Sequence, residues 1–271
     1  MSNVATVPAP WRLAADEQAA YARDGIVIPR ARLSAAAIGR LRDALDRLIA
    51  DNPDRRPAQL VNAHLPKGPE GVRGNEVFME TARDPAIVGL VSDLVGPDVI
   101  LWGCQVFCKP GGDGMEVPWH QDGHYWPIRP LATTTAWIAI DDSDTENGCM
   151  RVIPGSHRRG LLPHAKAPRD RVVLDLEVDA HAFDETTARD VVLQAGQLSL
   201  HDVYMIHGSR PNRSPRRRAG LAIRYMPATS LFDRTVPPMT SYGTAVIDFS
   251  RRPLWLVRGV DRAGNDFAVG H

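Results

Sequence analysis

Residues 119–123 read Trp-His-Gln-Asp-Gly, in which a histidine stands two positions before a carboxylate. Side chains alternate between the two faces of a strand, so His120 and Asp122 are predicted to point to the same side. Another histidine, His207, follows 87 residues later (207 − 120) in the strand-like run 198–208. Two histidines and one carboxylate on one face of a metal ion leave its other positions open, as in the facial triad of non-haem Fe(II) oxygenases. The pattern therefore predicts a metal site made of these three residues.

The residues after His207 strengthen this hypothesis, which would be weak if it rested on one His-x-Asp pair in a chain with nine histidines. Arg218 lies 11 residues after His207 (218 − 207), at the start of a predicted strand. A guanidinium facing a metal site can bind a carboxylate through two parallel hydrogen bonds. Ser209 can add a hydroxyl to the same carboxylate. Arg224 lies six residues beyond Arg218, hence on the same strand face, and is the alternative for this role.

From Val99 onward the chain has the character of a β protein. Short runs rich in β-branched and apolar residues alternate with Gly, Pro, Asn and Asp, which is typical of strands separated by turns. The predicted strands are 99–109, 133–141, 150–153, 191–193, 197–206 and 218–226.

The first hundred residues are predicted to be mostly helical, with helices over 14–24, 35–51 and 85–95. Ser34 is a good N-cap for the second helix, whose apolar residues recur at spacings that make one face. Asp84-Pro85 is a good opening for the third helix, because proline is tolerated in the first turn. Helices followed by many short strands predict a mainly β fold, a double-sheet jelly roll with the N-terminal helices packed outside.

The chain is expected to form one domain over residues 1–271, because β folds of this length often stay single. A helical layer is predicted at about 12–98, a core at about 99–227 and a C-terminal cover and tail at 228–271. Residues 155–190 are predicted to be a long polar insertion in the core, and long loops in compact domains are usually functional. Part of this insertion, with Gly111–Val117 and Ala228–Tyr242, is expected to form a mobile cover over the metal.

Composition restricts the partners of the protein. The chain has 32 basic and 32 acidic residues, so no overall field favours nucleic acid or an anionic membrane, and the basic run 213–218 is too short to change this. Three cysteines argue against a disulfide framework and for a reducing compartment. No apolar run approaches the roughly 18 residues of a membrane span, and residues 1–10 lack a secretory signal pattern. A cytoplasmic protein with a small-molecule substrate is the expectation.

Three blocks of this sequence resemble one known family. They are WHQDGHYWP (119–127), TAWIAIDDSDTENGCMRVIPGSHRRG (135–160) and HGSRPNRSPRRRAGLAIRYMP (207–227). They look like the phytanoyl-CoA dioxygenase-like family of Fe(II)- and 2-oxoglutarate-dependent oxygenases, over roughly residues 20–230. The resemblance implies a double-stranded β-helix, which is a jelly-roll core, and Fe(II), 2-oxoglutarate and O2 as cofactor and co-substrates.

The resemblance also implies roles for individual residues. By position, His120, Asp122 and His207 match the iron ligands. Arg218 matches the residue that binds the far carboxylate of 2-oxoglutarate, and Ser209 matches its frequent hydroxyl partner. The core motif shows no departure from the family pattern; Asp122 in particular is present, whereas related halogenases have a small residue there.

Other residues are assigned to the pocket with less direct support. Gln105 and Lys109 fall on the strand that lines the co-substrate pocket in such proteins. His124, Tyr125 and Trp126 follow Asp122 closely and are predicted to contact the substrate, with packing of a loop as the alternative. Trp137 is predicted to be a core aromatic. Four histidines without matched partners are predicted to lie on the surface or in loops: His157, His164, His181 and His201.

The substrate is predicted only as a class. The mixed aromatic and polar pocket candidates favour a polar, oxygen-rich natural product or sugar-like molecule, which would be hydroxylated, closed into a ring or desaturated. One alternative is an acyl-CoA hydroxylase of the same mechanism, for which Arg158-Arg159 and residues 213–218 are the only basic candidates. Another is a non-catalytic jelly-roll protein that binds a metal or ligand, although such a module needs no Arg218–Ser209 carboxylate clamp.

Overall fold

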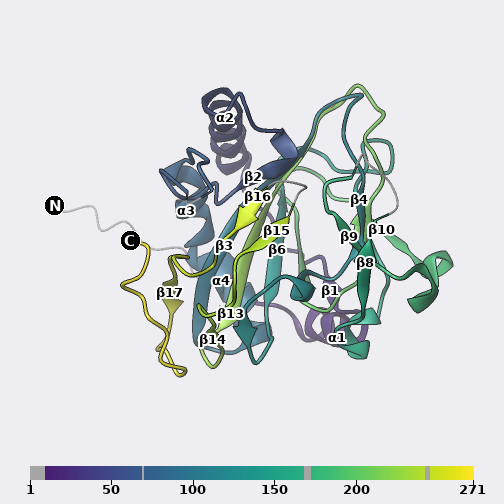
Figure 1. Ribbon diagram of the computed structural model, residues 1–271. Coiled ribbons are helices and arrows are strands. Elements are labelled where there is room, and N and C mark those ends of the chain that lie inside the picture. The colour runs from purple at the N-terminus through teal and green to yellow at the C-terminus, as the bar shows by residue number, and fades with distance from the viewer. Residues whose placement is uncertain (1–9, 69, 168–171, 242–244) are drawn as a thin grey trace.

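Two antiparallel sheets form the core of the computed structural model, which describes residues 10–68, 70–167, 172–241 and 245–271 (Figure 1). The larger sheet has the order β1-β11-β6-β13-β3-β17, with β2 also paired to β3. Its strands are β1 Ile26–Val27, β2 Leu60–Val61, β3 Val99–Lys109, β6 Thr134–Ala139, β11 Leu198–Asp202, β13 Arg218–Pro227 and β17 Trp255–Arg258. The smaller sheet has the order β10-β7-β12-β4. Its strands are β4 Val117–His120, β7 Met150–Val152, β10 Arg189–Val191 and β12 His207–Ser209. This arrangement confirms the predicted jelly roll.

Strand β13 shows how the sequence divides the two faces of the larger sheet. Ala219, Leu221, Ile223 and Tyr225 are buried in a core that they share with the helices. The alternate residues point the other way, because neighbouring side chains of a strand take opposite faces. Arg218, Ala222 and Arg224 consequently line a cavity between the sheets.

The helices are α1 Ala15–Asp24, α2 Ala35–Asp51, α3 Glu76–Ala82 and α4 Pro85–Val95. The predicted caps are present: Ser34 Oγ accepts a hydrogen bond from the Ala37 amide at 3.2 Å, and Asp84 Oδ1 accepts one from Ala86 at 2.9 Å. Leu41 and Leu45 of α2 and Ile87 of α4 bury their side chains in the core that covers the larger sheet. Figure 1 shows α2, α3 and α4 on this side of the molecule, away from β4 and β10. Helix α3 was not predicted, because seven residues are too few for a periodic apolar pattern.

The run 198–208 is not the single strand that its composition predicts. Strand β11 ends at Asp202, whose carboxylate accepts a hydrogen bond from the Tyr204 amide at 2.8 Å. The chain then crosses between the sheets and enters β12 at His207. This crossing places His207 opposite the larger sheet instead of within it. The strand predicted at 191–193 is also displaced, to β10 at Arg189–Val191.

The segments outside the core are more regular than predicted. Within 155–190, β8 His164–Lys166 pairs with β9 Leu176–Val178. The same segment contains three short 3-10 helices, which are η3 Ser156–Arg159, η4 Ala180–Ala182 and η5 Glu185–Thr187. Near the C-terminus, β14 Leu231–Phe232 pairs with β5 Ile128–Arg129, and β15 Met239–Ser241 pairs with β16 Ala245–Ile247. Residues 168–171 of the predicted insertion and Tyr242 of the predicted cover lie outside the described residues. The predicted boundaries of layer, core and cover stay predictions.

Two further features concern the cysteines and the helices. All three cysteines are buried free thiols. Among the described helices, none combines the length and the apolar character that crossing a membrane requires.

Candidate metal centre and co-substrate pocket

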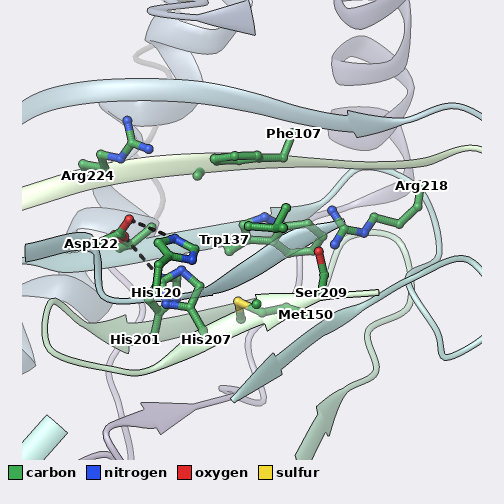
Figure 2. A pocket seen from close by; sticks show the side chains of 14 residues that line it. Phe107, His120, Asp122, Trp137, Met150, His201, His207, Ser209, Arg218 and Arg224 are labelled. Carbon is green, nitrogen blue, oxygen red and sulfur yellow. Dashed lines mark hydrogen bonds and ion pairs between the residues drawn. The ribbon is translucent and has the colours of Figure 1, made fainter. Parts of the chain in front are cut away.

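Three ligand-type side chains converge in the cavity between the sheets. His120 ends β4, His207 begins β12, and the two residues are direct partners in the strand pairing. Asp122 opens the 3-10 helix η2, Asp122–His124. One ligand atom from each of the three residues lies within 4.8 Å of the others, and all three side chains point into one space (Figure 2). The structure thus brings the predicted triad together.

The geometry that aims Asp122 differs from the one predicted. The chain leaves β4 at His120, and the Tyr125 amide donates a hydrogen bond to the Asp122 carbonyl at 3.1 Å, which closes a tight turn. Asp122 therefore does not share a strand with His120, and strand alternation is the wrong explanation. The turn itself brings the carboxylate to 3.7 Å from the His120 Nε2 atom.

The two imidazole rings are held in one tautomer by backbone carbonyls. His120 Nδ1 lies 2.9 Å from the Pro118 carbonyl oxygen, and His207 Nδ1 lies 3.0 Å from that of Met205. A carbonyl can only accept, so each Nδ1 carries a hydrogen, which leaves Nε2 as the ring nitrogen available to a metal. Such outer hydrogen bonds are what orients metal-binding histidines.

The protonation states suit a divalent cation. Burial alone would raise the pKa of the Asp122 carboxyl, but its contacts with His120 and His201 outweigh burial and hold that pKa well below the usual value. Burial lowers the pKa of His207 far below its usual value. An anionic carboxylate and a neutral imidazole are the forms that bind metal ions.

The donor set fits Fe(II). Two imidazole nitrogens and one carboxylate oxygen match the open facial triad, whereas a closed structural zinc site takes four ligands, commonly with sulfur. Within the described ranges, this is the cluster of histidine, cysteine and acidic side chains whose ligand atoms lie close enough to hold one ion. The residues present therefore suit an iron ion with free positions for other ligands.

Arg218 closes the other end of the same cavity. Its side chain is 3% exposed, its Nε donates to the Gly148 carbonyl at 3.0 Å, and its guanidinium lies 5.2 Å from the ring centre of Trp137. Burial lowers the pKa of Arg218 to about 10, so the group stays cationic at neutral pH. No carboxylate of the described chain lies within ion-pair distance of it. A buried cation is costly without a partner, which indicates that an anionic ligand completes this site.

Ser209 stands beside Arg218 in the cavity wall (Figure 2). Its hydroxyl is buried and has no hydrogen-bond partner within the described structure. Buried hydroxyls are normally satisfied, so this one also indicates a ligand. Phe107, Trp137 and Met150 supply apolar wall between this end and the triad.

Gln105 and Lys109 are buried, but both act through other residues instead of lining this cavity. The Lys109 ammonium donates to the backbone carbonyls of Ser209, at 3.4 Å, and of Arg210. The Gln105 side-chain oxygen accepts a hydrogen bond from Arg224 at 2.9 Å. Lys109 therefore fixes the strand that carries Ser209, and Gln105 fixes Arg224. Direct contact of either residue with a co-substrate stays a prediction.

The three predicted substrate residues lie in different surroundings. The His124 ring stacks on His164 with centres 4.2 Å apart, and Tyr125 lies against His124 edge to face at 5.1 Å. Trp126 is buried against Trp102, with ring centres 4.6 Å apart, in an apolar cluster. Substrate contact stays a prediction for all three residues, and the packing of Trp126 provides a structural reason for its presence.

His201 is a site residue that sequence reasoning missed. It was predicted to lie on the surface or in a loop, but its side chain is 2% exposed on β11 and lines the cavity. Its Nε2 lies 3.8 Å from Asp122 Oδ2, and Thr135 Oγ1 lies 3.5 Å from the same oxygen. The alternation Leu198, Ser199, Leu200, His201 gave a signal, because it puts a histidine on the face opposite two core leucines.

Gly220 gives Trp137 the space that it needs beneath Arg218. A Cβ atom at this position would overlap the Trp137 indole ring. We expect Gly220→Ala to displace that ring, to destabilise the fold by about 1–3 kcal/mol and to weaken 2-oxoglutarate binding. Chemical denaturation and co-substrate titration would measure both effects. Gly103→Ala is the control, because its Cβ would meet only Arg224 at an ordinary 3.6 Å; equal stability of the two variants would contradict the prediction.

Comparisons with known proteins agree with this geometry. A family model described as "Phytanoyl-CoA dioxygenase (PhyH)" matches residues 21–220. The peroxisomal phytanoyl-CoA dioxygenase of Bos taurus is 30% identical over 149 residues, which cover 53% of this chain and 44% of that protein. The matched segment thus spans less than half of that relative. The L-proline trans-4-hydroxylase of Streptomyces griseoviridis is 29% identical over 250 residues, covering 82% of this chain and 90% of that protein.

A solved structure shares the fold over almost the whole chain. The apo form of the non-heme monooxygenase ThoJ is 28% identical, covers 91% of this chain and 85% of its own, and has a TM-score of 0.70. The family match, the relatives and the jelly roll all support what the three sequence blocks predicted. This chain belongs to the phytanoyl-CoA dioxygenase (PhyH) family of Fe(II)- and 2-oxoglutarate-dependent oxygenases.

Proposed function

We propose that this protein is a dioxygenase that uses Fe(II), 2-oxoglutarate and O2 to oxidise an unactivated C–H bond of a small molecule. The observation that carries the proposal is one cavity with a His120-Asp122-His207 cluster at one side and Arg218 at the other, a buried cation with no ion-pair partner among the described residues. A facial triad and a carboxylate-binding arginine together match a metal that shares its free positions with a dicarboxylic keto acid.

Each residue of the cavity has a distinct task in this proposal. His120, Asp122 and His207 would hold the iron, which with 2-oxoglutarate and O2 supplies the oxidising chemistry. Arg218 and Ser209 would bind the far carboxylate of 2-oxoglutarate and so set the position of its keto end. Phe107, Trp137 and Met150 would exclude water from the space between, so that the oxidant meets only the substrate.

The substrate in this proposal is a small polar molecule, with neither nucleic acid nor membrane as partner. Relatives named L-proline trans-4-hydroxylase and ectoine dioxygenase support this class. The acyl-CoA alternative draws on the name of the bovine relative, but several of its basic candidates already have partners in the protein. Arg158 and Arg159 donate to backbone carbonyls. Arg216 pairs with Asp144 at 2.8 Å, and Arg217 pairs with Asp141 at 2.8 Å. The three free buried thiols support a reducing, cytoplasmic setting.

Uncoupled turnover tests the proposal against a non-catalytic binding protein. With Fe(II) and O2 but no added substrate, the protein should convert 2-oxoglutarate slowly to succinate, and Zn(II) in place of Fe(II) should stop this. A protein that binds Fe(II) and 2-oxoglutarate yet forms no succinate, alone or with a panel of small polar molecules, would favour the non-catalytic alternative.

The predicted cover leads to a prediction on hydrogen exchange. Segment 111–117 is joined to residues 212–214 by hydrogen bonds such as Gly112 N to Ser214 O at 2.7 Å, and it leads into β4, the strand that carries His120. We expect amide exchange in 111–117 and 228–241 to slow when Fe(II) and 2-oxoglutarate bind, because covers of this kind close over reacting groups. Helix α2, remote from the cavity, is the internal control. Equal exchange of both segments in the two states would leave the cover without support.

A further inference from the structure

Strand β13 brings two arginines to the same cavity. Arg218 and Arg224 are six residues apart, so they lie on one face of the strand, and both line the cavity that holds the metal cluster. Figure 2 shows them at opposite ends, with Trp137 between them and Asp122 on the side of Arg224. The proposed function gives Arg218 to 2-oxoglutarate and leaves Arg224 without a task.

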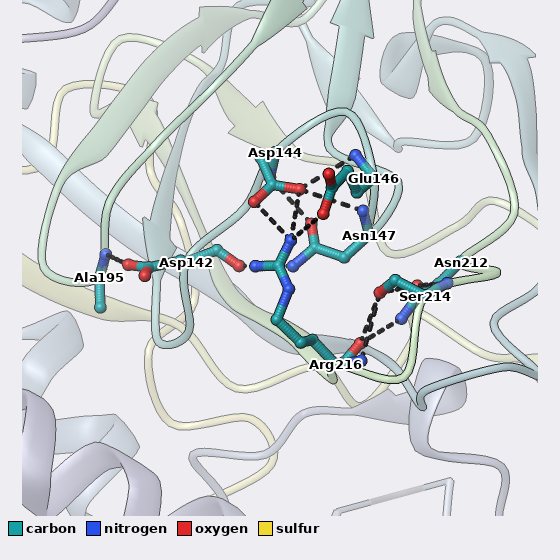
Figure 3. A network of polar contacts seen from close by, with 8 residues as sticks. All are labelled: Asp142, Asp144, Glu146, Asn147, Ala195, Asn212, Ser214 and Arg216. Atoms are coloured by element: carbon teal, nitrogen blue, oxygen red, sulfur yellow. Dashed lines mark hydrogen bonds and ion pairs between the residues drawn. The ribbon is translucent and has the colours of Figure 1, made fainter.

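Other arginines of this protein, which have structural roles, form ion pairs with carboxylates. Arg216 donates to Asp144 and Glu146 in a network at the surface (Figure 3). Arg217 pairs with Asp141 and Asp46, and the buried Arg252 pairs with Glu70 at 2.6 Å. In the described parts of the chain, Arg224 lies within ion-pair distance of no acidic side chain. The arginines that face the cavity thus lack the carboxylates that the others have.

Protein contacts fix the position of Arg224 without using up its donors. One terminal nitrogen donates to Gln105 Oε1 at 2.9 Å. The guanidinium carbon lies 5.2 Å from the ring centre of Trp126 and 5.7 Å from that of Trp102. Its Nε is buried and has no partner in the described structure. A guanidinium has five N–H donors, so a rigidly held group with unused donors remains.

The described residues offer no anion for these donors once the metal is in place. Asp122 lines the same cavity as Arg224, on the side of that arginine (Figure 2). The proposed function commits the Asp122 carboxylate to iron. Arg224 is only partly exposed to solvent, so an anion from outside the chain would stabilise its charge.

We infer that Arg224 binds a carboxylate of the substrate, and that the substrate is therefore a small carboxylic acid held beside the metal. This inference rests on the proposed function and narrows its substrate class. A planar guanidinium held beside two indole rings can bind a planar, singly charged carboxylate through two parallel hydrogen bonds. A phosphate dianion would call for further cations, and the nearby Arg252 is already paired with Glu70.

Acid and amide pairs test the inference without knowledge of the natural substrate. Protein saturated with Fe(II) and 2-oxoglutarate under anaerobic conditions is titrated with acetate, propionate and cyclopentanecarboxylate, each against its primary amide at equal ionic strength. Binding is followed by the shift of the melting temperature. We expect at least one acid to bind on the order of tenfold more tightly than its amide, as for a hydrogen bond to a charged group.

Variants identify the arginine responsible. Arg224→Gln should bring the ratio of the affinity for the acid to that for its amide to about one. Arg224→Lys should restore part of the preference for the acid, because lysine keeps the charge but lacks the two parallel N–H donors of a guanidinium. Arg251→Gln removes one exposed arginine charge and should keep the wild-type ratio. The inference is overturned if acids and amides bind alike, if no acid binds, or if Arg224→Gln keeps the preference.

The outcomes also separate this inference from the proposed function. Metal binding that survives Asp122→Ala in chloride-free buffer would end the proposed function, whatever the acid and amide titrations show. A loss of 2-oxoglutarate affinity in Arg224→Gln that exceeds the loss in Arg218→Ala would make Arg224 the co-substrate residue, and so overturn the inference. Intact 2-oxoglutarate binding together with a lost acid preference in Arg224→Gln is the result that supports it.

Discussion

His120→Ala, Asp122→Ala and His207→Ala are each expected to lose Fe(II) binding and turnover while the protein still folds. Each change removes one of three donors, and removing even an outer partner of a ligand commonly costs about 10–100-fold in metal affinity, so the loss of a ligand should exceed that. Each side chain lies in a cavity between two completed sheets, so the fold does not depend on it. Fe(II) titration, succinate formation and thermal unfolding would measure the three properties.

A matched control and one further variant sharpen this test. His181→Ala changes an exposed histidine of η4 and should behave as wild type. Asp122→Gly should open one position on the metal while both histidines remain, and chloride should then restore part of the lost Fe(II) affinity. Near wild-type turnover in any of the three alanine variants would mean that the residue changed is not a ligand.

Arg218→Ala is expected to raise the Michaelis constant for 2-oxoglutarate by on the order of 100-fold, because a two-pronged bond between charged groups is worth several times a neutral hydrogen bond. Fe(II) binding should stay close to that of the wild type, since Arg218 lies at the far end of the cavity from the triad. Arg218→Lys should recover only part of the loss. Succinate formation at varied 2-oxoglutarate concentrations measures the effect.

Two comparisons make this second prediction specific. Ser209→Ala removes one neutral hydroxyl beside Arg218 and should cause a much smaller rise, about tenfold or less. Arg224→Ala should leave the constant for 2-oxoglutarate nearly unchanged. A larger effect from Arg224→Ala than from Arg218→Ala would show that spacing along β13 assigned the wrong arginine.

The fold was predictable where local chemistry determines it. Ser34 and Asp84 cap the helices that their positions predict, and the run 99–109 coincides with β3. The crossing from β11 to β12 was not predictable, because the apolar pattern continues through residues 203–206 and conceals the turn at Asp202. Helix α3 was too short to leave a periodic signal.

The candidate site shows the same division. The metal cluster and Arg218 were predicted because a motif with fixed spacing carries them. His201 was missed because its nearness to Asp122 depends on a contact between segments far apart in sequence, in which the Gly123 amide of η2 donates to the Val203 carbonyl just after β11. Among the described residues Arg224 has no acidic partner. This too depends on how the sheets assemble, so the sequence around Arg224 could not predict it.

The placement of the site on both sheets has a consequence for the choice of keto acid. The metal cluster belongs to the smaller sheet and the turn after it, whereas Arg218 begins a strand of the larger sheet. Under the proposed function, one molecule must reach from the first to the second. The separation of the two sheets then sets the length of a molecule that can contact both the metal and Arg218. We therefore expect a diacid one methylene shorter or longer than 2-oxoglutarate to reach one of the two ends but not both, so that the packing of the two sheets would select the co-substrate by its length.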